Sequence, residues 1–483
     1  MSKFRLWTAG AAAIFVALVS TGCVDQRKEV ALYRKQLDAL AGVKSVDLPQ
    51  MWDPLTLQQA LRLTEQTNES LGLSGEQYLQ ALIARDRQVE NFLPTLSLGP
   101  SLSESQRVRG QGGSSSHRFS LPLTLNENVF DGFQNVNGVS QANLTVEQQR
   151  QLLLDAQQTV MLDTVQTYYA VLQAERSVVV DENSLAEQQE RVRQSDAQFR
   201  LGSGTPLAIA QSQAQASSTR VQLISDRNSV ITSRAMLSTL VGQTIGARPL
   251  IDGFESPDDI GQPLDGWLAE AQQNRQDLRA AELAVQAARY QVSIAMGEYL
   301  PSVDFSLSDL LYADPNPGQG RLGAGLSANI PLFTAGKVRG DVRDAFSGLR
   351  SALLAESQTK KKVEQDIRVG YADLENARDQ ISELRIELKA SRDALVLAQR
   401  QFTVGLATNL DLLTAQSQLL STQLQLAKEE YQEKIEYMNL LRVTGRLNLV
   451  AAAPTTQPVL HPDEQIEVTV PEVTRSTTTQ PNP

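Results

Sequence analysis

Residues 91–98 read NFLPTLSL, and the same pattern returns at residues 298–305 as EYLPSVDF. In both copies an aromatic residue and a Leu-Pro pair precede a short segment in which polar and apolar side chains alternate. Proline ends a helix because it lacks the amide donor and clashes with the preceding turn, and alternation with a period of two is typical of a strand with one apolar face. Each stretch therefore predicts a junction at which a helix ends and a strand begins.

The similarity extends far beyond these two stretches. Pro94 and Pro301 lie 207 residues apart, whereas Phe130 and Phe333, and later Gly202 and Gly405, lie 203 residues apart. The spacing changes where a variable loop between two strands is expected. The chain is therefore predicted to hold two copies of one unit, over residues 55–245 and 262–448.

Each unit is predicted to contain the same elements in the same order. Apolar residues at helical spacing predict helices over 56–90, 134–200 and 206–242 in the first unit and over 262–298, 337–402 and 409–446 in the second. Alternation predicts strands over about 94–108 and 117–130, and over about 301–312 and 321–333. Glycines followed by a capping residue, Thr205 in the first unit and Thr408 or Asn409 in the second, predict a sharp reversal after each long helix. The fold class is mainly α, with one β-hairpin in each unit.

The N-terminus has the layout of a secretory signal peptide over residues 1–22. Basic residues precede an apolar run over 9–19, small residues follow, and then comes Cys23. A cysteine at the cleavage point resembles a bacterial lipoprotein, in which this thiol carries lipid, although Ser20 stands where leucine is usual. In such lipoproteins an aspartate after the cysteine favours retention in the inner membrane, and Val24 stands there instead. The alternative is an exported protein whose cleavage point merely falls near a cysteine.

The two terminal segments of the mature chain are predicted to lack a packed core. Residues 23–54 are interpreted as a lipidated linker, and residues 451–483, rich in proline and threonine, as a disordered tail. Between them no segment has 18 consecutive apolar residues, so no transmembrane helix is predicted.

Composition excludes several classes of protein. One cysteine and two histidines exclude an internal disulfide framework and a Cys- or His-rich metal site. With 55 acidic against 44 basic residues, a nucleic-acid partner is not expected. No nucleophile or acid–base constellation is apparent, so neither an enzyme nor a cofactor site is predicted.

The hairpins of one chain provide too few strands to form a closed barrel. Two hairpins give four strands, whereas about eight strands are the practical minimum for a closed barrel. Open strand edges are not tolerated in hydrocarbon. A barrel of such hairpins must therefore close by association of several chains.

The repeated segments together resemble the TolC-like outer-membrane efflux proteins. The segments that carry the resemblance are residues 93–94, 129–132 and 199–202 in the first unit and residues 331–333, 402–405 and 410–412 in the second. The resemblance implies a homotrimer with a twelve-stranded barrel in the outer membrane of a Gram-negative-type bacterium above a twelve-helix periplasmic tunnel. It implies a passive exit duct for small molecules or proteins in tripartite efflux or type I secretion, with a periplasmic adaptor and an inner-membrane transporter as partners. The alternative is a periplasmic coiled-coil adaptor or structural lipoprotein, against which the amphipathic hairpins argue.

The resemblance also assigns roles at the periplasmic tip. It places the adaptor-docking turns at Leu201, Gly202 and Ser203 and at Val404, Gly405 and Leu406. The alternative is that these glycines only permit the chain to reverse.

The periplasmic gate of the family maps onto Asp411, Thr414 and Phe402. Asp411 matches an acidic ring position, at which three carboxylates would attract cations across a trimer entrance. The alternative is an ordinary aspartate in the first turn of a helix. Thr414 stands at a second acidic position and Phe402 at that of a gate-locking tyrosine, while its two partners fall on Ala407 and Ala208. The lock known in relatives therefore cannot form with these side chains.

Overall fold

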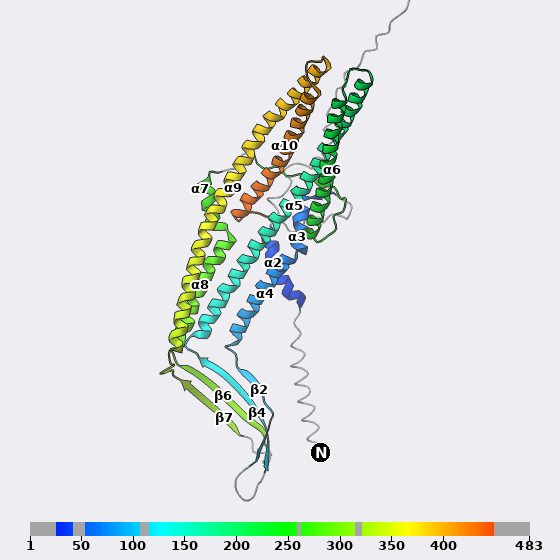
Figure 1. Ribbon diagram of the computed structural model, residues 1–483. Coiled ribbons are helices and arrows are strands. Elements are labelled where there is room, and N and C mark those ends of the chain that lie inside the picture. Colours follow the sequence, from blue (N-terminus) through cyan, green and yellow to red (C-terminus); the bar gives the residue numbers. More distant parts are fainter. Residues whose placement is uncertain (1–25, 42–53, 107–114, 258–261, 314–320, 449–483) are drawn as a thin grey trace, which may run out of the picture.

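The computed structural model describes residues 26–41, 54–106, 115–257, 262–313 and 321–448. The predicted signal peptide, Cys23 and residues 451–483 lie outside the described residues. The described chain forms long helices that run side by side (Figure 1). The larger β-sheet lies at one end of the helices, and the two turns that connect helix to helix lie at the other. The predicted class, mainly helical with two β-hairpins, is confirmed.

Two helices of 67 residues each extend through the whole helical part: α5 (Gln134–Arg200) and α9 (Lys337–Thr403). At 1.5 Å per residue each reaches ~100 Å. The shorter helices that pack along them are α6 (Pro206–Val241) and α4 (Glu69–Glu90) on α5, α10 (Asn409–Val443) on α9, and α8 (Gln276–Gly297) on both. Among the described residues, no helix combines the length and the apolar character that crossing a membrane requires.

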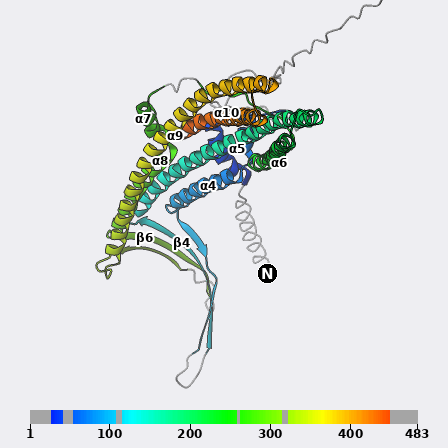
Figure 2. The same ribbon diagram turned by 45° about the horizontal axis from the view of Figure 1, so that its top comes forward.

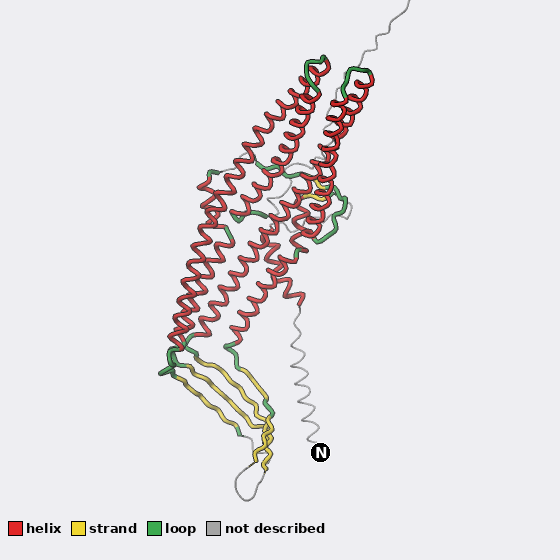
Figure 3. Tube along the Cα trace, viewed as in Figure 1, coloured by secondary structure: helices red, strands yellow, loops and turns green. Residues whose placement is uncertain are grey.

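The strands of the larger sheet gather at the end of the helices away from the turns (Figure 3). They are β2 (Thr95–Leu98), β3 (Ser101–Gln106), β4 (Ser115–Phe130), β6 (Ser302–Ala313) and β7 (Leu322–Asn329). All pairs are antiparallel, in the order β2-β4-β6-β7, with β3 also on β4. The strands curve across the end of the helical part (Figure 2). The sheet therefore joins the two hairpins and leaves β2–β3 at one edge and β7 at the other.

The apolar side chains of this sheet are not covered by the rest of the chain. The exposed leucines of the edge strands are Leu96 (67%), Leu98 (55%), Leu102 (76%), Leu322 (73%) and Leu326 (71%). Leucines on alternate positions of a strand share one face. The edge strands thus present an apolar surface for which this chain supplies no cover.

The helices predicted over 56–90 and 262–298 are each two helices, and this part of the prediction is wrong. Helix α3 (Leu57–Thr67) precedes α4, and α7 (Leu264–Asn274) precedes α8. Asn68 and Arg275, which separate the members of each pair, have extended backbones with ψ of 124°. Asn68 also caps α4, because its side chain accepts a hydrogen bond from the amide of Leu71 (3.1 Å).

Two further boundaries differ from the prediction. The strand expected over 94–108 is interrupted at residues 99–100, because Pro100 has no amide with which to pair. The segment interpreted as a linker contains a helix, α2 (Gln26–Ala41), which packs on α4. Its Tyr33 ring covers Gly75, where a Cβ atom would lie 2.5 Å from that ring.

The largest hydrophobic cluster lies midway along the helices, where α3, α7 and α10 meet the two long helices. A short parallel pair, β1 (Leu55–Thr56) with β5 (Leu250–Ile251), crosses the same region (Figure 3). The buried hydroxyl of Tyr168 lies 2.7 Å from Leu55 O and 2.8 Å from Ile251 O. This contact ties both strands to α5.

Candidate functional site

Each long helix ends in a turn built around one glycine. In both turns the glycine amide donates to the carbonyl three residues before it (2.9 and 3.1 Å), and the next amide donates to the carbonyl five residues before it (2.9 and 2.8 Å). Gly202 has φ of +78° and Gly405 has φ of +77°. Only glycine adopts this left-handed conformation without steric cost, so the backbone requires both residues.

The predicted docking residues project from these turns. Leu201 is 83% exposed, Val404 69% and Leu406 81%. Ser203 is also exposed. Each turn therefore presents apolar side chains to its surroundings at the far end of the helical part.

The returning helices begin with capping residues. Thr205 caps α6 by accepting a hydrogen bond from the amide of Ala208 (3.2 Å). In α10 the cap is Thr408, whose hydroxyl accepts from the amide of Asp411 (3.2 Å), while the Asp411 carboxylate accepts from the amide of Thr408 (2.8 Å). The Thr408 hydroxyl also donates to the Asp411 carboxylate (2.6 Å), and this hydrogen bond, together with the one from the Thr408 amide, lowers the pKa of Asp411. Within one chain, Asp411 is thus a capping carboxylate, the alternative that the sequence left open.

Thr414 lies one turn beyond Asp411, and both side chains are exposed. The Thr414 hydroxyl donates to the carbonyl of Leu410 in its own helix (2.8 Å). Two of the three residues predicted for the gate therefore share one exposed face at the start of α10.

Uncharged side chains join the two helical hairpins near the turns. The contacts are Asn409 Nδ2 to Ala208 O and to Ser212 Oγ (3.5 Å each), Gln188 Nε2 to Gln416 Oε1 (3.3 Å), and Gln215 Nε2 to Ser417 Oγ (3.3 Å). They bring α10 against both α5 and α6. The sequence analysis did not identify these residues.

Phe402, predicted for the gate, contacts an arginine of the other hairpin. The guanidinium carbon of Arg191 lies 5.7 Å from the centre of the Phe402 ring. Burial lowers the pKa of Arg191, and its Nε atom has no hydrogen-bond partner among the described residues. A cation over an aromatic face is attracted by the ring quadrupole, so this pair links α5 to α9.

Aromatic and apolar side chains also mark the junction between the helices and the sheet. Leu332 is 92% exposed, Phe333 89%, Tyr299 54% and Phe92 44%. Within one chain these side chains are therefore not part of a packed core. Their exposure leaves these residues available to an apolar or interfacial environment.

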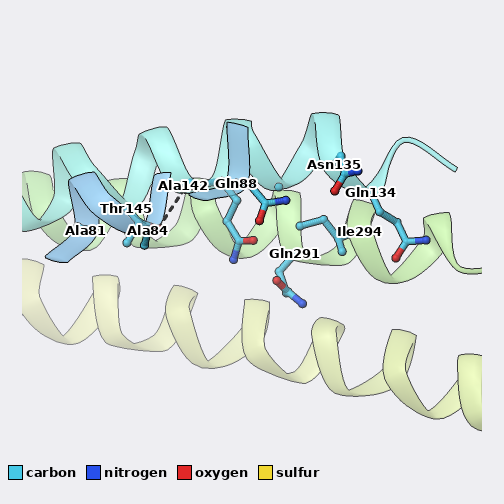
Figure 4. A pocket seen from close by; sticks show the side chains of 11 residues that line it. Ala81, Ala84, Gln88, Gln134, Asn135, Ala142, Thr145, Gln291 and Ile294 are labelled. Carbon is cyan, nitrogen blue, oxygen red and sulfur yellow. Dashed lines mark hydrogen bonds between the residues drawn. The ribbon is translucent and has the colours of Figure 1, made fainter. Parts of the chain in front are cut away.

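A pocket of about 470 Å³ lies between α4, α5 and α8 near the sheet (Figure 4). Its lining consists entirely of uncharged residues: Ala81, Ala84, Gln88, Gln134, Asn135, Gly138, Gln141, Ala142, Thr145, Gln291 and Ile294. Gly138 lets Gln88 lie across α5, because a Cβ atom there would be 2.3 Å from Gln88 Nε2. Over the described part of the chain, no group of three His, Cys, Asp or Glu side chains could hold a metal ion.

The sequence of this chain is similar to those of known outer-membrane proteins. The family described as "Outer membrane efflux protein" matches residues 76–243 and 267–446. The outer membrane efflux protein BepC of Brucella suis is 29% identical over 357 residues, which cover 72% of this chain and 77% of BepC. The outer membrane protein TolC of Escherichia coli is 23% identical over 440 residues, which cover 86% of this chain and 87% of TolC.

Solved structures share the fold. The Campylobacter jejuni CmeC outer membrane channel superimposes with a TM-score of 0.75 at 16% identity, over 85% of this chain and 92% of that channel. At this identity the likeness concerns the fold alone. The arrangement of the strands and long helices is therefore that of a known channel structure.

Proposed function

Because this chain belongs to the outer membrane efflux protein family, we propose that it is the outer-membrane exit duct of a tripartite efflux pump or a type I secretion system. The duct is passive and carries small molecules or proteins from the periplasm or a pump to the exterior. No catalytic step and no cofactor is proposed.

One observation carries this proposal: the two hairpins form a single open sheet with exposed leucines on both edge strands, at the end of helices of 67 residues. Unpaired edges and an apolar face are stable in hydrocarbon only when strands of other chains close the sheet. We propose three chains, since three copies of two hairpins give a barrel of about twelve strands. The helices of the three chains then form the periplasmic tunnel.

The exposed residues of the strand–helix junction fit the level of the membrane surface. Aromatic side chains are common where a barrel meets the lipid headgroups. We assign Phe333 and Tyr299 to this level. Lipid on Cys23, outside the described residues, would add a second anchor on the same membrane.

The turns fit the periplasmic entrance. Their exposed apolar residues, Leu201, Val404 and Leu406, are proposed to dock a periplasmic adaptor, which connects the duct to an inner-membrane transporter. The alternative of a periplasmic adaptor or structural lipoprotein gives no role to an open sheet with exposed leucines.

Asp411 is proposed to act at that entrance. The carboxylate is exposed, and hydrogen bonds from Thr408 lower its pKa, so it stays ionised to a lower pH than an ordinary aspartate does. In a trimer, three such carboxylates at a narrow opening would attract cations. Thr414 and Phe402 are assigned to the same constriction.

Reconstitution tests the function directly. Protein extracted from the outer-membrane fraction is expected to have the mass of three chains and to conduct ions across a planar lipid bilayer. A water-soluble monomer that is fully folded without detergent and never conducts would contradict the proposal.

A further inference from the structure

One line of buried residues on α5 is unusually polar. Ala174, Asp181, Gln188 and Ser195 follow one another at intervals of seven residues, and their exposures are 9%, 0%, 2% and 3%. A seven-residue interval places them on one stripe of a helix that packs in a coiled coil. Asp181 thus occupies a core position on the side of α5 that its partner helices cover.

The facing stripe of α6 contains a second aspartate. Ser212, Thr219 and Asp226 have the same interval, and Ser212 Oγ lies 3.1 Å from Ser195 Oγ. Asp181 lies two heptads before Ser195 on α5, and Asp226 lies two heptads after Ser212 on α6. Because the two helices are antiparallel, this spacing places Asp181 opposite Asp226.

Two ion pairs fix this antiparallel register independently. Arg227 Nη2 contacts Glu182 Oε1 at 2.6 Å, and one heptad away Arg234 pairs with Glu175. Glu182 and Arg227 directly follow Asp181 and Asp226 in the sequence. The two aspartates therefore form one layer between α5 and α6, which lie side by side in the tip half of the molecule (Figure 1).

No cation among the described residues neutralises this layer. Both carboxylate oxygens of Asp181 are buried without a hydrogen-bond partner from the described part of the chain. On α6, Gln222 Nε2 donates to Asp226 Oδ1 (3.1 Å), and Arg227 is bound by Glu182. On α10, which also packs on α5, residues 418–427 include no charged side chain, and Glu387 of α9 accepts hydrogen bonds from Gln418 and Thr422.

Asp181 is fully buried and Asp226 is half-buried. Two carboxylates that face each other in such a layer do not both ionise readily, because like charges repel where water is largely excluded. One proton between them turns one carboxyl into a donor and leaves the other as its acceptor. We propose that the Asp181–Asp226 layer is a proton-binding site that clamps α6 onto α5. The proposal does not depend on the assignment of the chain as a duct.

The electrostatics of the site agree with this geometry. Burial, together with the neighbouring Asp226, raises the pKa of Asp181 from 3.8 to about 7. A carboxyl whose pKa is higher in the folded than in the unfolded state binds more protons when folded. The layer therefore contributes stability below about pH 4, and this contribution declines as the pH rises from about 4 to about 7.

Thermal unfolding of the full-length protein, purified in detergent with a chelator present, tests the proposal. When the pH is raised from about 5 to about 8, the melting temperature of the wild type is expected to decrease more than that of Asp181→Asn. The amide of the variant keeps the shape of the carboxyl group and donates a hydrogen bond at both pH values. Glu190→Gln is the matched control: it removes a carboxylate from an exposed position of the same helix, where Glu190 pairs with Arg193, and its midpoint should follow the wild type at both pH values.

Infrared spectroscopy supplies a readout that packing alone does not change. The wild type should lose a protonated-carboxyl band between the two pH values, and this loss should be absent in Asp181→Asn. If Asp181→Asn does not fold, Asp226→Asn takes its place with the same expectation. An equal pH dependence in wild type and Asn variant, or an unchanged carboxyl band, would overturn the proposal.

Discussion

At the scale of single residues, the turn glycine Gly405 and the helix glycine Gly348 make opposite contributions. Gly405 needs its positive φ, whereas Gly348 lies inside α9, has no positive φ and would present an added Cβ atom to open space. Gly405→Ala is therefore expected to destabilise the protein by about 1–2 kcal/mol, and Gly348→Ala to stabilise it by about 0.5–1 kcal/mol. Denaturant unfolding of both variants measures the difference. Equal effects of the same sign would show that the turn conformation is not required.

Asp411 tests the proposed entrance. Asp411→Asn removes the charge and keeps much of the capping geometry, so block of single channels by divalent cations should weaken while the protein stays folded. Because hydrogen bonds from Thr408 lower the pKa of Asp411, the block in the wild type should persist at pH values where an ordinary aspartate is half protonated.

The matched control for this experiment is Asp196→Asn, since the Asp196 carboxylate lies near the other turn and pairs with Arg200 (2.8 Å). It should leave the cation block unchanged. If Asp411→Asn also leaves the block unchanged, Asp411 is a capping residue only.

The contact of Arg191 with Phe402 calls for a double-mutant cycle. Arg191→Met and Phe402→Leu each remove the cation–aromatic interaction and keep an apolar side chain. We expect a coupling free energy of unfolding of about 0.5–2 kcal/mol between the two substitutions. Additive effects would show that the pair contributes no link between α5 and α9.

At the scale of helices and strands, the sequence predicted the elements better than their interruptions. The long helix expected over 134–200 and α5, Gln134–Arg200, share their limits, because proline and glycine mark the junctions around them. The break at Arg275 has no such marker. Its backbone leaves the helix where the side chain reaches Asp277 and Asp366, and Asp366 lies 91 residues away.

The difference between local patterns and long-range contacts also explains which candidate residues could be predicted from the sequence. The family resemblance assigned Phe402 and Asp411 by their positions relative to Gly405, and the Asp181 layer could have been found from the spacing of seven along α5. Arg191 could not, because its contact joins residues 211 positions apart on different hairpins. Local patterns predict local geometry, whereas contacts between the two units depend on how the units pack.

Arg275 gives a prediction at this scale. Its side chain is 3% exposed, and its removal leaves Asp366 without its partner between α8 and α9. Arg275→Met should therefore destabilise the protein by about 3–5 kcal/mol. Arg368→Met, which removes an exposed pair with Glu364, should change stability by less than about 1 kcal/mol. Chemical denaturation of both variants provides the comparison, and similar losses would argue against the buried ion pairs as the cause of the break.

At the scale of the whole molecule, the central claim is that one chain cannot close its own sheet. The edges at β2–β3 and β7 are different surfaces, so an assembly that joins one to the other is head-to-tail, and in hydrocarbon only a closed ring leaves no strand edge unpaired. Exposed leucines on both edge strands predict that this ring lies in lipid. The family to which the chain belongs agrees with that arrangement.

Disulfide cross-linking between the two edges tests this claim most directly. Cys23 is the only native cysteine. We would place one cysteine in β3 and one in β7, in a panel that scans the register around Leu102 and Leu326, and oxidise the protein in outer membranes. The account predicts covalent dimers and trimers that end at three chains for some pairs. Monomers throughout the panel, or a ladder of products that continues beyond three chains, would contradict it.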